Sequence, residues 1–256
     1  MKKMLFTALA MSLFFAVPAH AHFGMVLPDK NVAMEKKDAD ISVQFIFTHP
    51  FEGKAMDLDV EKAQVFNDGK ATDITSTLKP ETYKGKKAFK TSYKLAKPGV
   101  YTIAMTPKPY WEPAEDKFII HYTKTVVAAF GEEEGWDQPV GLPVEIVPLS
   151  RPFGLYAGNT FRGKVLVDGK PGANLDVEVE YLNGSAGTFT APSDYSVTQV
   201  VKTDENGIFT YSTPCAGWFG LTVPARSPLK ARTATLNSAA SSGQSSTGCS
   251  LPSKVV

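Results

Sequence analysis

The sequence predicts an all-β protein in which two β-sandwich domains follow a cleaved export signal. Apolar and polar residues alternate with a period of two along most of the chain, which is typical of strands that bury one face. The 18 prolines and 20 glycines divide these stretches into short segments, joined by turns such as Asp168-Gly169 and Asn206-Gly207. No stretch after the signal carries a sustained helical stripe. Together these observations favour immunoglobulin-like or prealbumin-like sandwiches.

Residues 1–21 have the pattern of a secretory signal peptide: a basic start, a short apolar block and small residues before a cut. We expect cleavage after Ala21, with cleavage after Ala19 as the alternative. The apolar block is too short to span a bilayer comfortably, and no later run approaches ~18 apolar residues. The mature chain should therefore be a periplasmic protein without stable membrane insertion.

The strand pattern is clearest in seven segments. These are residues 41–47, 101–105, 118–123, 125–130, 161–167, 175–181 and 197–202. They group into a first sandwich at 22–130 and a second at 149–223, separated by a linker at 131–148 that holds three glutamates and three prolines. The second group, with its Asp-Gly turn and alternating strands, is similar to prealbumin-like and carboxypeptidase-regulatory-like sandwiches. Residues 224–256 are rich in serine and alanine, and we expect a flexible tail there.

The composition excludes several functions. With 27 basic and 26 acidic residues, the charge balance argues against nucleic acid or an acidic membrane surface as a partner. The two cysteines, Cys215 and Cys249, are not in a CxxC spacing, and whether they form a disulfide stays open. The motifs GxSxG and HExxH and a glycine-rich phosphate loop are all absent from the sequence. The chemistry expected is binding, not catalysis.

The four histidines, His20, His22, His49 and His121, all lie in the first half of the chain. Cleavage after Ala21 would make His22 the amino terminus, so that its α-amine and ring could chelate one metal ion, with a second histidine adding a third nitrogen. Cleavage after Ala19 would make His22 the third residue of the chain. Its ring, the free α-amine and two backbone amides would then form a known square-planar binding site for a metal ion. Both outcomes favour Cu(II) or Ni(II), which prefer tetragonal nitrogen sites.

Plainer explanations exist for each histidine. His49 could be a turn residue before Pro50, and His121 could be a buried histidine hydrogen-bonded to backbone. Alternation sets His121 on one strand face with Ile119 and Thr123. Taken together, His22, His49 and His121 favour a shared metal site. Additional candidate ligands are Met25, Glu52, Glu112 and Glu115. The acidic residues, together with Asp116, could instead be solvated surface residues. Tyr110 and Trp111 could line a pocket or close the end of the sandwich.

Several longer stretches carry a family resemblance. AHFGMVLP, FTHPFEG, YWEPAEDKFIIHY, GLPVEIVPLSRPFG and TDENGIFTYSTPCAGWFG, within about residues 19–220, resemble a group of periplasmic proteins associated with nickel and cobalt uptake, long catalogued as a domain of unknown function. The resemblance implies a protein that binds Ni(II), with Co(II) or Cu(II) as alternatives. It would use His22, His49 and His121, and would supply an energy-coupling nickel/cobalt transporter in the inner membrane. After Gly220 the sequence departs from the family pattern.

Two other functions remain open from the sequence. An amino-terminal histidine with a second histidine on a β-sandwich is also the arrangement of copper-dependent polysaccharide oxidases, although their flat aromatic surface and flanking motifs are not evident here. The third possibility is a structural or adhesion-type sandwich in which the histidines are incidental.

Overall fold

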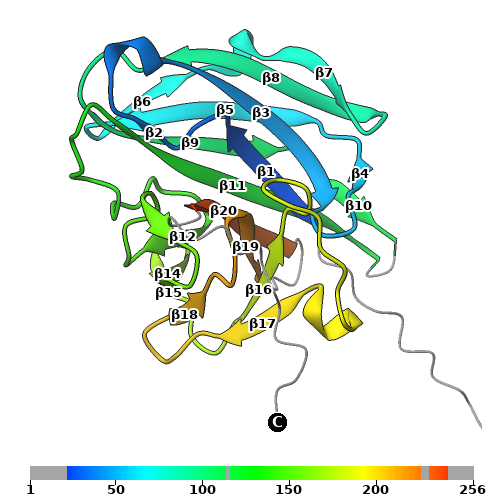
Figure 1. Cartoon of the computed structure of the whole chain (residues 1–256). Helices are drawn as coiled ribbons and strands as arrows, with labels where there is room; N and C mark the ends of the chain where they lie inside the picture. The colour runs from blue at the N-terminus through cyan, green and yellow to red at the C-terminus, as the bar shows by residue number, and fades with distance from the viewer. Residues whose placement is uncertain (1–21, 114–115, 226–230, 242–256) are drawn as a thin grey trace, which may run out of the picture.

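The computed structural model describes residues 22–113, 116–225 and 231–241. These residues contain no α-helix; the only helical segments among them are three single 3₁₀ turns, η1 (Lys36–Asp38), η2 (Thr75–Thr77) and η3 (Asp194–Ser196). Strands make up the rest of the regular structure, and they form two packed sandwiches (Figure 1). The predicted all-β fold class is confirmed.

The first sandwich has a five-stranded antiparallel sheet on its outer side. Its order is β1-β3-β8-β7, with β4 added at the end of β3. The bounds are β1 Phe23–Pro28, β3 Asp40–His49, β4 Lys54–Met56, β7 Lys79–Tyr83 and β8 Lys86–Lys94. Figure 1 shows this sheet lying over β11, β9 and β5 of a second, longer sheet.

That longer sheet has eleven strands and runs through both sandwiches in the order β17-β16-β19-β20-β11-β9-β5-β6, with the short strands β2, β10 and β13 attached at its sides. The first-sandwich strands are β2 Val32–Ala33, β5 Val60–Asn67, β6 Lys70–Asp73, β9 Gly99–Pro107, β10 Tyr110–Glu112 and β11 Lys117–Ala129. The second-sandwich strands are β13 Leu155–Tyr156, β16 Asp176–Tyr181, β17 Gln199–Lys202, β19 Gly217–Ala225 and β20 Ala231–Ser241. The two sets meet where β11 and β20 pair in parallel.

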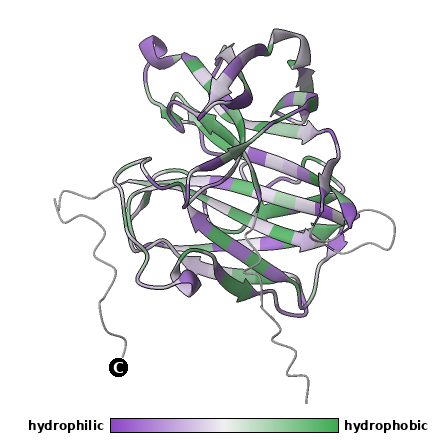
Figure 2. Ribbon diagram, turned by 90° about the vertical axis from the view of Figure 1, so that its right-hand side faces the viewer, coloured by the Kyte–Doolittle hydropathy of each residue, from purple (hydrophilic) through white to green (hydrophobic). Residues whose placement is uncertain are grey.

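The second sandwich is closed by a four-stranded sheet built around β14. Its strands are β12 Val144–Pro148, β14 Thr160–Val167, β15 Lys170–Pro171 and β18 Ile208–Ser212. Each sandwich has its own apolar core, one around Phe45, Ile103 and Val127 and the other around Phe161 and Phe219. Figure 2 shows hydrophobic and hydrophilic residues alternating along the strands, as the period-two pattern predicts.

The expected flexible tail is wrong for residues 231–241. These residues form β20, the strand that joins the sandwiches, between β19 and β11. The low apolar content predicted a flexible tail because it did not reveal that threonine and asparagine are buried here in place of apolar residues. Thr235 and Asn237 are each 1% exposed, and the Thr235 hydroxyl shares a 2.9 Å hydrogen bond with that of Thr222. Threonine also favours strands intrinsically, because its branched Cβ suits the pleated surface.

Two other boundaries differ from expectation. Segments 118–123 and 125–129 belong to one continuous 13-residue strand, β11, because buried Lys124 continues it without a turn, and Phe130 lies just beyond its end. The last five residues of the expected linker at 131–148, Val144–Pro148, form β12. The expected signal peptide at 1–21 and Cys249 lie outside the described residues. No helix in the described part of the chain is long and apolar enough to cross a membrane.

Candidate metal centre

His22 and His49 are brought together by the pairing of β1 with β3. The antiparallel register sets Phe23 opposite Thr48, so one further step places His22 beside His49. Their ring centroids are 4.5 Å apart. His49 is the last residue of β3 and is 7% exposed. Two histidines that are distant in the sequence therefore meet at the end of one sheet.

His121 approaches the pair from the opposite sheet. It lies on β11, and its ring centroid is 6.5 Å from that of His22. The ring of Phe47, two residues before His49, lies between the sheets at 4.9 Å from His121 and 5.7 Å from His22. The close approach of β1 and β11 depends on Gly24, where a Cβ would lie only 2.5 Å from the Thr123 hydroxyl oxygen. The three histidines thus gather at one end of the first sandwich.

His121 is unusual for a buried histidine. It is 4% exposed, and neither of its ring nitrogens has a hydrogen-bond partner within the described residues. Burial lowers the pKa of His121 to about 3, with a further contribution from nearby His22. The ring is therefore neutral at physiological pH and keeps a nitrogen lone pair available. A histidine retained for structure would be expected to use that buried nitrogen in a hydrogen bond.

The β10–β11 hairpin adds a carboxylate and a phenol. Glu112 is 8% exposed, and its Oε2 lies 3.3 Å from Nδ1 of His22. Tyr110, two residues earlier and on the same face, has its ring centroid 5.4 Å from that of His22. Between them Trp111 points outward, 43% exposed, against Phe118. Glu112 is thus buried beside a histidine and is not solvated surface, and Tyr110 walls the cluster.

A small cavity of about 20 Å³ opens beside His121. Its lining includes Phe47, Tyr110 and the segment from Asp57 to Asp59. A space of this size accommodates about one water-sized atom or ion. The position next to the available imidazole is therefore suited to a single small ligand.

The structure separates the other candidate ligands from this cluster. Met25 is on the opposite face of β1, packed with Phe23 and Ile46, because neighbouring side chains on a strand point to opposite sides. Glu52 is exposed in the turn after β3 and lines a different groove. Asp116 is exposed, and Glu115 lies outside the described residues. Of the four additional ligand candidates, only Glu112 contacts the histidine cluster in the described structure.

The cluster is not a ready-made coordination sphere. Among the described residues, no group of three or more histidine, cysteine or carboxylate side chains is arranged to hold a metal ion as it stands. The types of donor nevertheless fit: imidazole nitrogens with one carboxylate suit late first-row divalent metals. Binding would require the rings to turn toward a common point, and the α-amine of His22 adjoins residue 21, outside the described residues.

Comparison with known proteins assigns the family. A family model described as "Domain of unknown function (DUF4198)" matches residues 19–227. The chain belongs to the DUF4198 family. The match extends past Gly220 and covers the whole of β19, and it includes all three clustered histidines. No curated protein matches this DUF4198 chain.

Solved structures resemble the DUF4198 chain only in general form. The D0–D1 domain of intimin is 13% identical, with 85% of this chain and 98% of that chain covered, at a TM-score of 0.24. An alpha-2-macroglobulin from Escherichia coli is 10% identical, with coverage of 87% and 16% and a TM-score of 0.24. Tandem Ig domains of titin are 10% identical, with coverage of 87% and 100% and a TM-score of 0.20. Scores this low carry no argument about function.

The sequence analysis did not identify two residues of the DUF4198 site, Phe47 and Gly24, which pack beside the histidines and are not ligands. Phe47 precedes His49 by two positions, so strand alternation could have placed it in the cluster. Gly24 follows His22 by two positions, but its contact with Thr123 depends on how the two sheets pack. The position of Phe47 could be predicted from the local sequence, and the contact of Gly24 could not.

Proposed function

We propose that this DUF4198 protein binds one transition-metal ion, Ni(II) most favoured and Co(II) or Cu(II) as alternatives, at His22, His49 and His121. The observation that carries the proposal is the buried, neutral ring of His121, whose two nitrogens lack hydrogen-bond partners within the described residues. A buried polar group without a hydrogen-bond partner destabilises the folded state. Its presence here is explained if a bound ligand uses the nitrogen.

The roles of the site residues follow from their positions. His49 and His121 would contribute imidazole nitrogens from opposite sheets, and His22 would contribute its ring and, after cleavage at Ala21, its α-amine. Glu112, 3.3 Å from the His22 ring, would hold that ring in one orientation or serve as an oxygen ligand. Because metal ligands must be deprotonated, protons compete with the ion for these nitrogens, and binding should weaken in acid.

The biological role that we propose is capture and delivery. The amino-terminal signal pattern supports export to the periplasm, and the carrier would supply an energy-coupling nickel/cobalt transporter in the inner membrane. The burial of His49 and His121 supports holding an ion over catalysis on a large substrate. A copper-loaded sample assayed with ascorbate and peroxide tests this point, since turnover of a polysaccharide would favour the copper-oxidase alternative.

The decisive experiment compares amino termini. Protein beginning at His22 and protein with one extra residue before His22 are titrated with Ni(II) and Cu(II) in a calorimeter. We expect one ion per chain for the first form and at least tenfold weaker binding for the second. Equal affinities would show that the α-amine is not a ligand, and no binding by either form would overturn the proposed function. Mass spectrometry of the exported protein identifies the natural first residue.

A further inference from the structure

The turn that follows His49 is held by the second sandwich. The backbone N–H of Asn183 donates a 3.1 Å hydrogen bond to the carbonyl oxygen of Pro50. The backbone N–H of Phe51 donates a 3.4 Å hydrogen bond to the carboxylate of Glu180, which is 2% exposed on β16. A turn of the first sandwich therefore has hydrogen bonds to two residues of the second.

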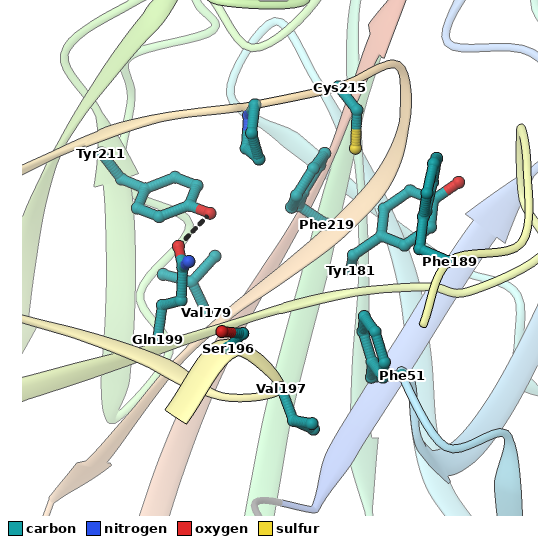
Figure 3. A pocket seen from close by; sticks show the side chains of 11 residues that line it. Phe51, Val179, Tyr181, Phe189, Ser196, Val197, Gln199, Tyr211, Cys215 and Phe219 are labelled. Atoms are coloured by element: carbon teal, nitrogen blue, oxygen red, sulfur yellow. Dashed lines mark hydrogen bonds between the residues drawn. The ribbon is translucent and has the colours of Figure 1, made fainter. Parts of the chain in front are cut away.

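The side chain of Phe51 strengthens this attachment. Its half-buried ring packs against the core of the second sandwich and lines a cavity there. Figure 3 shows Phe51 on the same side of that cavity as Tyr181 and Phe189. Val197 lines the same cavity. The aromatic ring thus acts as an anchor placed in a partner domain, comparable to an aromatic anchor at a protein interface.

The chain between Phe51 and His49 is short and constrained. Pro50 lies between them with a fixed φ angle and restricts His49 to extended conformations. The N–H of Gly53 donates a 2.9 Å hydrogen bond back to the carbonyl oxygen of His49. The Thr48 hydroxyl donates to the carbonyl oxygen of Lys54, which joins β3 to β4. A displacement of Phe51 would therefore move the backbone of His49.

We propose that the second sandwich positions His49, and thereby sets the affinity of the metal centre, through the anchored side chain of Phe51. This inference rests on the proposed function and deepens it. Phe51 is a positioning residue: it would touch no ion, and it would act by holding the turn that orients His49. The second sandwich then contributes to ion binding although it contains no histidine.

The test uses the full mature protein with Phe51→Ala and the conservative Phe51→Leu. The ring signals of His49 in metal-free protein, recorded by NMR, report its order directly. We expect Phe51→Ala to broaden or split the His49 signals and to weaken Ni(II) binding about tenfold or more, as loss of an orienting contact does at other metal sites. Phe51→Leu, which keeps an apolar side chain against the second core, should restore most of both.

A control separates positioning from general stability. Phe161 is 1% exposed in the same core but is not among the residues that line the cavity. Phe161→Leu should lower the melting temperature while leaving the His49 signals and Ni(II) affinity unchanged. The inference is overturned if Phe51→Ala leaves the His49 signals unaltered, or if Phe161→Leu changes them equally. If wild-type protein binds no metal, the proposed function fails, and the NMR comparison still decides whether Phe51 positions His49.

Discussion

Lys124 and Glu145 form an ion pair inside the protein, with 2.6 Å between Nζ and Oε1 and side chains only 2% and 1% exposed. The lysine is on β11, three residues from His121, and the glutamate is on β12 of the second sandwich. The same carboxylate accepts hydrogen bonds from the backbone N–H groups of residues 140–142. Burial lowers the pKa of Lys124, and Glu145 opposes that shift. Through this ion pair and the hydrogen bonds to residues 140–142, Glu145 contacts the first sandwich and the linker from its position on the second sandwich.

Removing Lys124 alone should destabilise the fold strongly. Lys124→Met would leave the Glu145 carboxylate buried without its cation, which typically costs about 3–5 kcal/mol. Urea unfolding at pH 7 measures the loss. Lys202→Met, at the exposed pair with Asp176, is the control and should have a much smaller effect. Equal losses for the two variants would show that the buried pair contributes no more than a surface pair.

Gly24→Ala should strain the contact between β1 and β11. The added Cβ would lie 2.5 Å from the Thr123 hydroxyl oxygen and 3.2 Å from the end of the Met105 side chain. We expect a loss of about 1–3 kcal/mol in unfolding free energy, the usual range for overpacking. Combining it with Thr123→Ala, which removes the clashing oxygen, should recover part of the loss. A double variant no more stable than Gly24→Ala would assign the strain to another contact.

His121→Phe should keep or raise the stability of the fold. The ring nitrogens of His121 lack partners in the described structure, so an apolar ring of similar shape loses no hydrogen bond that the structure shows there. The same change should abolish Ni(II) binding in calorimetry. Thermal melting of the metal-free protein supplies the stability comparison. A large loss of stability would mean that His121 serves the fold and not a ligand.

Glu180 should make stability depend on pH. Burial raises the pKa of Glu180 to about 7, although hydrogen bonds from Thr198 and the Phe51 backbone oppose the shift. The folded state therefore holds this proton more tightly than the unfolded chain does. The resulting contribution to stability is complete below pH ~4.5 and is lost as the pH rises through about 7, by up to roughly 3 kcal/mol.

Glu180→Gln should flatten this part of the stability profile, because the amide does not ionise. Denaturant unfolding between pH 5 and 8.5 measures the profile, with Glu205→Gln, in an exposed turn, as the control. An unchanged slope in Glu180→Gln would show that other groups set the pH dependence.

Ending the chain at residue 230 should prevent folding, because β20 would be lost from the middle of the eleven-stranded sheet. Both β19 and β11 would then lose their hydrogen-bonded neighbour, and Leu236 would leave the second core. Circular dichroism and solubility measure the outcome, with a chain ending at Ser241 as the control. A folded, soluble product ending at residue 230 would restore the interpretation of this region as a dispensable tail.

Local sequence pattern was sufficient to locate three strands of the first sandwich, β3, β9 and β11. Alternation identified the strands that contain Phe45, Ile103 and His121, and it set His121 on one face of β11 with Ile119 and Thr123. The structure shows that this face is buried. The same rule, applied to β1, would also have separated Met25 from His22. These features depend on neighbours within one strand, and the pleat of the backbone determines them whatever lies opposite.

By itself, then, the sequence determined the all-β class, the positions of strands β3, β9, β11, β14, β16 and β17, and the three candidate histidines. Tertiary structure decided that His22, His49 and His121 meet, that Glu112 joins them, and that β20 is a central strand. The reason is that sheet register and sheet packing bring together residues up to 211 positions apart, as in the hydrogen bond from Val26 N–H to Asn237. Such contacts are selected by the packing of the whole fold, which no local pattern contains.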